Sequence, residues 1–150
     1  MSDHFLVVIP ADPKAELPPT AEDIRAALAE IAGTTESRVK HYGRIQFIDC
    51  GENFERILCS ACEAEASVDW WGHQMDHCWD DETGFDLHAH AMPCCGAMLS
   101  LDKLKYERRQ GFARWMISAR NSTRGPLSAD EISQLEAVAG LKLVGIAQAY

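Results

Sequence analysis

Four of the six cysteines in this 150-residue chain are spaced in two pairs that suit a metal ion. Cys59-Ser-Ala-Cys62 follows the apolar pair Ile57-Leu58, as the first knuckle of a zinc ribbon follows its strand. Two thiolates from one tight turn can bind one ion, and cysteine is a preferred ligand of tetrahedral Zn²⁺. The Cys-x-x-Cys pair therefore predicts half of a zinc site.

The other half is expected in Met92-Pro93-Cys94-Cys95-Gly96. This segment has the proline and glycine of a knuckle of the form Cys-Pro-x-Cys-Gly, with Met92 in place of the first cysteine. Cys94, at the variable position, substitutes for the missing ligand. The predicted ligand set is Cys59, Cys62, Cys94 and Cys95, with His90 as the first reserve because imidazole also binds zinc. Four cysteines leave no open coordination position, which predicts structural zinc.

Other interpretations of the cysteines stay open. The thiols can be buried and reduced, because free cysteine is among the most buried residue types. A redox Cys-x-x-Cys needs its first cysteine at a helix N-terminus with a lowered pKa, and the acidic Glu63 and Glu65 after Cys62 have the opposite effect. Disulfides are not expected, because Met1-Ser-Asp-His4 lacks the basic region and apolar run of a secretory signal.

The histidines near these cysteines form two further patterns. His73 and His77 lie one turn apart on a helix, and with Cys78 they offer an alternative second metal site. The zincin motif needs glutamate directly after its first histidine, whereas Gln74 stands there. His88-Ala-His90 lacks the glutamate of the zinc-deaminase signature, and the adjacent cysteines break its second element. Neither pattern predicts a known type of metalloenzyme.

Acidic and aromatic side chains dominate the segment between the two cysteine pairs. Residues 63–90 contain eight aspartates and glutamates and no lysine or arginine. Such a segment is either a solvated acidic face or a surface that attracts a basic partner. Its tryptophans either pack the segment onto the rest of the protein or anchor a partner. The predicted partner-binding residues are Trp70, Trp71, Trp79, Asp80, Asp81 and Glu82.

The secondary-structure elements that must position these residues are predicted from sequence patterns in the N-terminal and C-terminal parts of the chain. Residues 5–9 and 39–48 are rich in β-branched and aromatic residues, which predicts strands. Between them, Thr20 and Asp23 predict a capped helix start, and Gly33 predicts its end. The N-terminal part is therefore expected to be a β-α-β unit.

The C-terminal part repeats the order of elements. Residues 112–118 and 141–147 predict strands, and Ser128 with Glu131 predicts a capping box at the start of the helix between them. We therefore predict an α+β fold in which two β-α-β halves form a ferredoxin-like sandwich around a central zinc-ribbon-like insertion.

Length and charge limit the remaining possibilities. One domain of residues 1–150 is expected, with 50–105 as the metal-binding insertion. The net charge of −9 argues against general nucleic-acid binding, and no apolar run approaches the length of a membrane span. We expect a soluble, cytoplasmic protein with no membrane partner.

Three further motifs are Pro-Cys-Cys-Gly at 93–96, Leu-Asp-Lys-Leu-Lys-Tyr at 101–106 and Gln-Gly-Phe-Ala-Arg at 110–114. With the Cys-x-x-Cys pair, they resemble a group of uncharacterised bacterial zinc-ribbon-containing proteins that combine a Cys-x-x-Cys with a Pro-Cys-Cys-Gly. Asp102 and Lys103 stand where that group has Asn-Asp. The resemblance implies a metal-binding accessory protein and implies no reaction. Several small bacterial proteins of this kind are immunity factors that neutralise a toxin.

Together these patterns predict a zinc-stabilised protein-binding module of immunity type, whose acidic insertion covers the basic cleft of a toxin domain. The alternative is a metal- or thiol-dependent enzyme that uses Cys59, Cys62 and the histidines of 73–77. Since the chain has no glycine-rich phosphate loop, nucleophile elbow or paired-carboxylate signature, an enzyme is the less favoured of the two.

Overall fold

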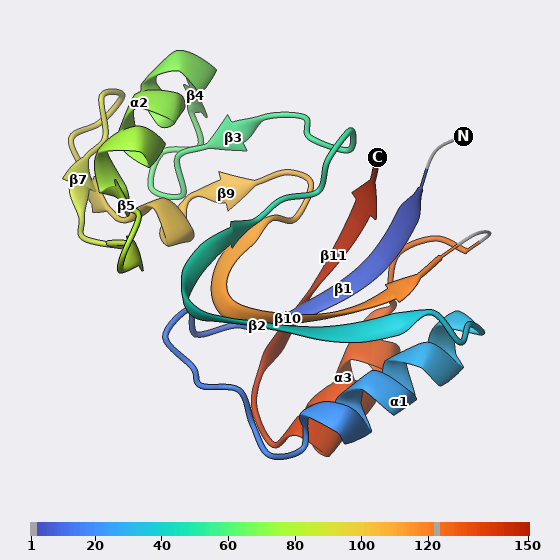
Figure 1. Ribbon diagram of the computed structural model, residues 1–150. Helices are drawn as coiled ribbons and strands as arrows, with labels where there is room; N and C mark the ends of the chain where they lie inside the picture. The colour runs from blue at the N-terminus through green and yellow to red at the C-terminus, as the bar shows by residue number, and fades with distance from the viewer. Residues whose placement is uncertain (1–2, 122–123) are drawn as a thin grey trace.

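A computed structural model describes residues 3–121 and 124–150 of the chain. Four long strands form the main sheet: β1 (His4–Pro10), β2 (Ser37–Ile48), β10 (Gly111–Arg120) and β11 (Leu143–Ala149). They lie in the order β11-β1-β10-β2, and each neighbouring pair is antiparallel. Helices α1 (Ala21–Ala32) and α3 (Ala129–Ala139) cover one face of this sheet (Figure 1). The expected mixed α+β architecture is confirmed.

The helix boundaries follow local signals, with one exception. Both helices end at a glycine in the left-handed conformation, Gly33 and Gly140. The Ser128–Glu131 capping box starts α3 as predicted. At α1 the predicted side-chain cap is wrong, because the Thr20 hydroxyl donates to the Ala139 carbonyl, 3.4 Å away, instead of capping its own helix. Thr20 therefore ties the two helices together.

Successive side chains of a strand point to opposite faces of the sheet, and the central strands carry apolar side chains on both faces. On β1, Leu6 and Val8 pack towards the helices, while Val7 and Ile9 belong to a second cluster on the other face. Trp115 of β10 is fully buried under the helices, and its indole N–H donates to the Ala15 carbonyl. The apolar side chains on both faces of the central strands are therefore buried.

The insertion consists of short elements that lie at one end of β2 and β10, away from α1 and α3 (Figure 1). Its elements are β3 (Ile57–Leu58), β4 (Glu65–Ala66), α2 (Val68–Cys78), β5 (Trp79–Asp80), β6 (Gly84–Phe85), β7 (His90–Ala91), β8 (Met98–Leu99), the 3₁₀ helix η1 (Leu101–Lys103) and β9 (Lys105–Tyr106). Strands β4, β3 and β9 form one small sheet, and β7 pairs with β8 in another. Elements this short need a core or a metal to hold them.

Strand β2 joins the insertion to the main sheet. The pairing of β2 with β10 shifts register between Ala113 and Trp115, and Gly43 in β2 has a positive φ of 73°. Beyond this irregularity, Ile45 pairs in parallel with Gly84 of β6. A Cβ on Gly84 would lie 2.5 Å from the Ile45 carbonyl oxygen, so only glycine permits this close approach. The main sheet therefore continues through β6 and β5.

The insertion has an apolar core of its own. Ile57, Cys59, Met92 and Leu101 are buried in it, and Phe112 of β10 reaches it from the main sheet. Among the described residues, none of the helices is both long enough and apolar enough to cross a bilayer.

Candidate metal centre

The first cysteine loop follows β3 and has two backbone hydrogen bonds that close it. The N–H of Cys59 donates to the Ala64 carbonyl (2.8 Å), and the N–H of Glu63 donates to the Cys59 carbonyl (2.8 Å). Glu63 takes a left-handed conformation, with a φ of 63°. Such a turn bends the chain back on itself and directs the side chains of Cys59 and Cys62 to one side.

The second loop, between β7 and β8, has the same pattern of hydrogen bonds. Met92 N–H donates to the Ala97 carbonyl (2.9 Å), and Gly96 N–H donates to the Met92 carbonyl (2.8 Å). Gly96 is left-handed, with a φ of 75°. Position by position, Met92 corresponds to Cys59 and Cys95 corresponds to Cys62. Cys94 therefore extends from the tip of the loop rather than from the position where a knuckle has its first ligand.

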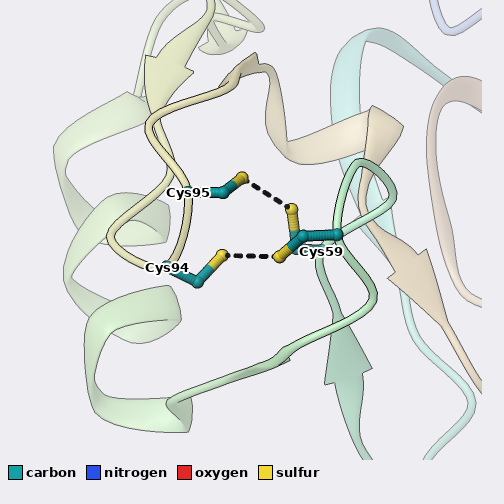
Figure 2. A group of neighbouring side chains, drawn as sticks. Cys59, Cys94 and Cys95 are labelled. Carbon is teal, nitrogen blue, oxygen red and sulfur yellow. Dashed lines mark hydrogen bonds between the residues drawn. The ribbon is translucent and has the colours of Figure 1, made fainter.

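The two loops face each other, and their four thiols lie close together. The sulfur of Cys59 is 3.8 Å from that of Cys95, and the sulfur of Cys62 is 3.4 Å from that of Cys94. Figure 2 shows Cys94 and Cys95, on one loop, directed towards Cys59 on the other. All four Sγ atoms lie within 4.8 Å of one another. A tetrahedral zinc ion with bonds of about 2.3 Å places its sulfurs about 3.8 Å apart, so the cluster has the dimensions of a metal site.

Hydrogen bonds from the loops change the acidity of these thiols. The backbone N–H of Cys62, and after it that of Ala61, lower the pKa of Cys59 to about 7 from an ordinary value of 9.0. The hydrogen bond with the Cys62 thiol, and then partial loss of solvent around the sulfur, raise the pKa of Cys94 to about 12. Metal ligation needs thiolates. The loop amides thus favour the ligating form at Cys59, and a cation is needed to obtain it at Cys94.

The four cysteines predicted as ligands are the four that the fold brings together. Cys59 is fully buried in the insertion's core, while Cys62, Cys94 and Cys95 are exposed at its edge. Cys50 is buried elsewhere, where it packs with the main sheet. A closed set of four thiolates can hold an ion but leaves no position for a substrate.

The reserve ligand His90 lies in a different group. Its Nε2 is 3.2 Å from the sulfur of Cys78, and His88 joins these two residues. The sequence interpretation paired Cys78 with His73 and His77 instead. The fold replaces those partners with His88 and His90, because the chain after β6 runs back past the C-terminus of α2, where Asp86 N–H donates to the Cys78 carbonyl (2.8 Å). The signal for this group was the alternate spacing of His88 and His90, which puts both on one side of an extended chain.

The tryptophans of α2 contribute to packing. Trp71 contacts Phe47, Phe54 and Tyr106, and its indole N–H donates to the Tyr106 hydroxyl (3.1 Å). Trp70 also packs, half-buried, against the insertion's core. The side chain of Trp71 joins α2 to β2 and β9, so most of its ring is not available to a partner.

The turn between β5 and β6 carries the remaining predicted partner-binding residues. Trp79 is half-buried beneath the Arg44 guanidinium, which lies 5.1 Å from the ring centroid, and its N–H donates to Asp81 (2.8 Å). The Asp80 carboxylate accepts the N–H groups of Glu82 and Thr83, which lowers its pKa. Asp80, Asp81 and Glu82 are all exposed, but Asp80 has a structural task in closing the turn.

Comparisons of the chain with family models, with curated proteins and with solved structures found no match.

Proposed function

We propose that Cys59, Cys62, Cys94 and Cys95 bind one Zn²⁺ ion that holds the two loops together as a zinc-ribbon-like unit. The supporting observation is the packing of four sulfurs at separations of 3.4 and 3.8 Å across two loops with matching hydrogen bonds. All-sulfur ligation favours a soft or borderline ion over calcium or magnesium, and tetrahedral Zn²⁺ suits four thiolates. We assign the ion a structural role.

We also infer that the main sheet and its two helices are a split β-α-β, ferredoxin-like sandwich. The strand order β11-β1-β10-β2, with antiparallel neighbours and both helices on one face, supports this assignment. In such a fold each β-α-β half contributes two strands that are separated by a strand of the other half. The zinc-ribbon-like unit is then an insertion between the two halves.

The zinc assignment can be tested through the unusual second loop. Untagged protein is expected to contain about one tightly bound zinc ion at these cysteines, and Cys94→Ala is expected to lose it, measured by elemental analysis and by a thiol-sensitive chelator assay. In the double variant Met92→Cys/Cys94→Ala, the new thiol occupies the position that Cys59 has in the first loop. This variant is expected to regain the ion, because it restores a regular Cys-Pro-x-Cys knuckle.

Cys50→Ser serves as the matched control, since Cys50 is a buried cysteine outside the cluster. It is expected to keep the zinc ion. Wild-type protein with no metal at these cysteines, or a Cys94→Ala variant with full zinc content, would contradict the assignment. Failure of the double variant alone would contradict the proposed equivalence of Met92 and Cys59.

For the activity of the whole protein, we propose binding of a basic protein partner in the cytoplasm, in the manner of an immunity protein that neutralises a toxin. The observation that carries this proposal is that all eight acidic side chains of residues 63–90 are exposed on the insertion. Lys105, from outside the segment, pairs with one of them, Glu63 (3.2 Å). A surface with this excess of one charge accelerates the association of an oppositely charged partner.

The rival proposal, a thiol-dependent enzyme, is supported less well by the same loops. The pKa of Cys59 is lowered, as a redox thiol requires and contrary to the effect expected of Glu63 and Glu65. However, Cys59 is buried and lies with Cys62 in a turn after a strand rather than at the N-terminus of a helix. Thiol titration of native protein distinguishes the two proposals. The thiols of a free dithiol catalyst are expected to react with the probe in the protein as purified. The thiols of a metal-bound cluster are expected to react only after a chelator removes the ion.

The partner proposal predicts binding that depends on salt. A partner captured from the native host and then purified is expected to be basic, and its association rate is expected to fall steeply as salt shortens the Debye length from about 10 Å at 0.1 M to about 3 Å at 1 M. Glu82→Lys is expected to slow association, because Glu82 is exposed beside Trp79 and, unlike Asp80, does not close the turn with its side chain.

Glu30→Lys is the control for this experiment. Glu30 is exposed on α1, and its reversal changes the net charge by the same amount at a distance from the insertion. Equal effects of the two variants, an association rate indifferent to salt, or an acidic partner would each contradict the electrostatic proposal.

A further inference from the structure

A second group of metal-binding side chains lies in the insertion, separate from the four cysteines. It consists of Cys78 at the C-terminus of α2, His90 in β7 and His88 just before β7. Their ligand atoms lie within 4.8 Å of one another, and the Cys78 sulfur is 3.2 Å from Nε2 of His90. A tetrahedral zinc ion bound to one sulfur and one nitrogen holds them about 3.6 Å apart, so this pair is already near the required separation.

Three histidine rings lie close together beside Cys78, although a single hydrogen bond between Cys78 and His90 needs only one of them. The rings of His88 and His90 have centroids 4.3 Å apart, and the ring of His77 lies 6.2 Å from each. Cys78 is buried and His90 is half-buried. A shared cation accounts for this grouping, because it can accept one nitrogen from each of His88 and His90 together with the sulfur of Cys78.

The surroundings of the group also orient its members. Oδ2 of Asp86 lies 3.2 Å from Nδ1 of His88, so Nδ1–H can donate to the carboxylate, which leaves the lone pair of Nε2 free to bind a metal ion. Histidine ligands of metal ions commonly donate their other ring N–H to a carboxylate, which fixes the ring's orientation and tautomer. The backbone N–H of Asp86 in turn donates to the Cys78 carbonyl, so the backbone that carries this carboxylate is anchored to the same helix end as the thiol.

We propose that Cys78, His88 and His90 bind a second divalent ion, of the zinc class, distinct from the ion at the four cysteines. One thiolate and two imidazoles suit Zn²⁺ or Co²⁺ better than magnesium or calcium. Three protein ligands leave one tetrahedral position for water or for a donor atom of a ligand, with His77 at the rim. This is the coordination of exchangeable and catalytic sites rather than of closed structural ones.

Metal stoichiometry tests the proposal directly. Wild-type protein dialysed against a small excess of Zn²⁺ is expected to hold two ions, and His88→Gln and His90→Gln are expected to hold one. His73→Gln is the matched control, because His73 is an exposed histidine of α2 outside the group, and it is expected to hold two. Cys94→Ala should lose the other ion and keep this one, so the two sites are counted independently.

A measurement on the wild type keeps the test decisive if a variant folds poorly. After replacement of zinc by ¹¹³Cd²⁺, two resonances are expected, one at the position of a four-sulfur site and one at that of a site with one sulfur and two nitrogens. A single ion per chain in excess zinc, a single four-sulfur resonance, or folded His88→Gln and His90→Gln variants that still hold two ions would overturn the second site. A protein with only the mixed site would instead overturn the four-cysteine assignment.

Discussion

Met92 and Cys59 occupy equivalent places in two loops, yet only one of them has a thiol. Both side chains are buried in the same apolar core, at 2% and 0% exposure. A thioether fills the volume of that position but is a poor ligand for a divalent ion beside thiolates. The loop compensates at its tip, where Cys94 reaches the cluster from a different direction. The thiol of the second loop therefore lies two residues further along the chain than the thiol of the first, although the two loops have the same hydrogen-bond pattern.

Trp71 illustrates how a residue suited to an interface can be used inside a fold. Trp71→Ala is expected to lower the free energy of unfolding by about 3 kcal/mol, because it removes contacts with Phe47, Phe54 and Tyr106. It also leaves the Tyr106 hydroxyl, which donates to the Leu101 carbonyl (2.9 Å), without its indole donor. Chemical denaturation of wild type and variant under the same conditions measures the loss.

Trp79→Ala provides the comparison, since Trp79 lies at a surface turn beneath Arg44. Its loss of stability is expected to be clearly smaller than that of Trp71→Ala. A Trp71→Ala variant that unfolds like the wild type but no longer binds the partner would identify Trp71 as an interface anchor instead.

At the scale of elements, the start of α3 depends on a charged cap. The Arg124 guanidinium forms a two-pronged ion pair with the Glu131 carboxylate, and the backbone N–H of Ser128 donates to it as well (2.9 Å). These donors, Arg124 first, hold the pKa of Glu131 at about 2, below its ordinary value of 4.5. The ion pair also links the segment before α3 to the first turn of the helix.

The depressed pKa of Glu131 predicts a specific pH dependence of stability. A carboxyl with a lower pKa in the folded state contributes stability that is fully present above pH 4.5 and is lost as the pH falls towards 2. Glu131→Gln removes this contribution, so the difference in unfolding free energy between wild type and variant should shrink between pH 5 and pH 2. Urea denaturation at several pH values measures it, with Glu30→Gln as the exposed control. A difference that stays constant over this range would contradict the assignment.

The elements differ in how much of them the sequence could predict. The C-terminal ends of α1 and α3 and all four long strands follow from local patterns, because glycine stops and β-branched runs act over a few neighbouring residues. Thr20 has the same local signal as Ser128 but bonds to α3 instead, a choice that depends on how the helices pack. The parallel pairing of Ile45 with Gly84 was not predictable either, since it joins segments whose proximity only the folded insertion creates.

The same distinction applies to the candidate sites. The four-cysteine cluster could be predicted because each pair is local and because a metal ion has fixed demands on ligand type and number. For the other group, the alternate spacing of His88 and His90 predicts only that the two share one side of an extended chain; that this chain returns past Cys78 at the end of α2 depends on the fold and could not be predicted. Spacing along a helix pointed to His73 and His77, whereas the return of the chain past α2 brought in His88 and His90.

At the scale of the whole molecule, the separation of the insertion's core from the helix-covered core predicts that metal removal destabilises the two parts unequally. The helix-covered core contains no member of the cysteine cluster, whereas Cys59 belongs to the insertion's core. Hydrogen exchange in the presence of a strong chelator should therefore accelerate in β3, β7 and β9, while β1 and β10 stay protected. An ion that binds only the folded state stabilises the segments that supply its ligands, so removal of the ion is expected to destabilise those segments first. A uniform loss of protection would show that both cores unfold as one unit.

The meeting of β2 and β10 has a kinetic consequence. Gly111 pairs with Ile48, so residues 49–110 must form a closed loop before β2 and β10 can pair. The entropic cost of closure grows with the logarithm of loop length, by about 0.6 kcal/mol per doubling. If the proposed ion binds before these strands pair, it joins Cys59 to Cys95, 36 positions apart, and shortens the open loop by more than half. The entropic cost of pairing β2 with β10 is then smaller, so early metal binding is expected to accelerate formation of the main sheet, far from the thiols.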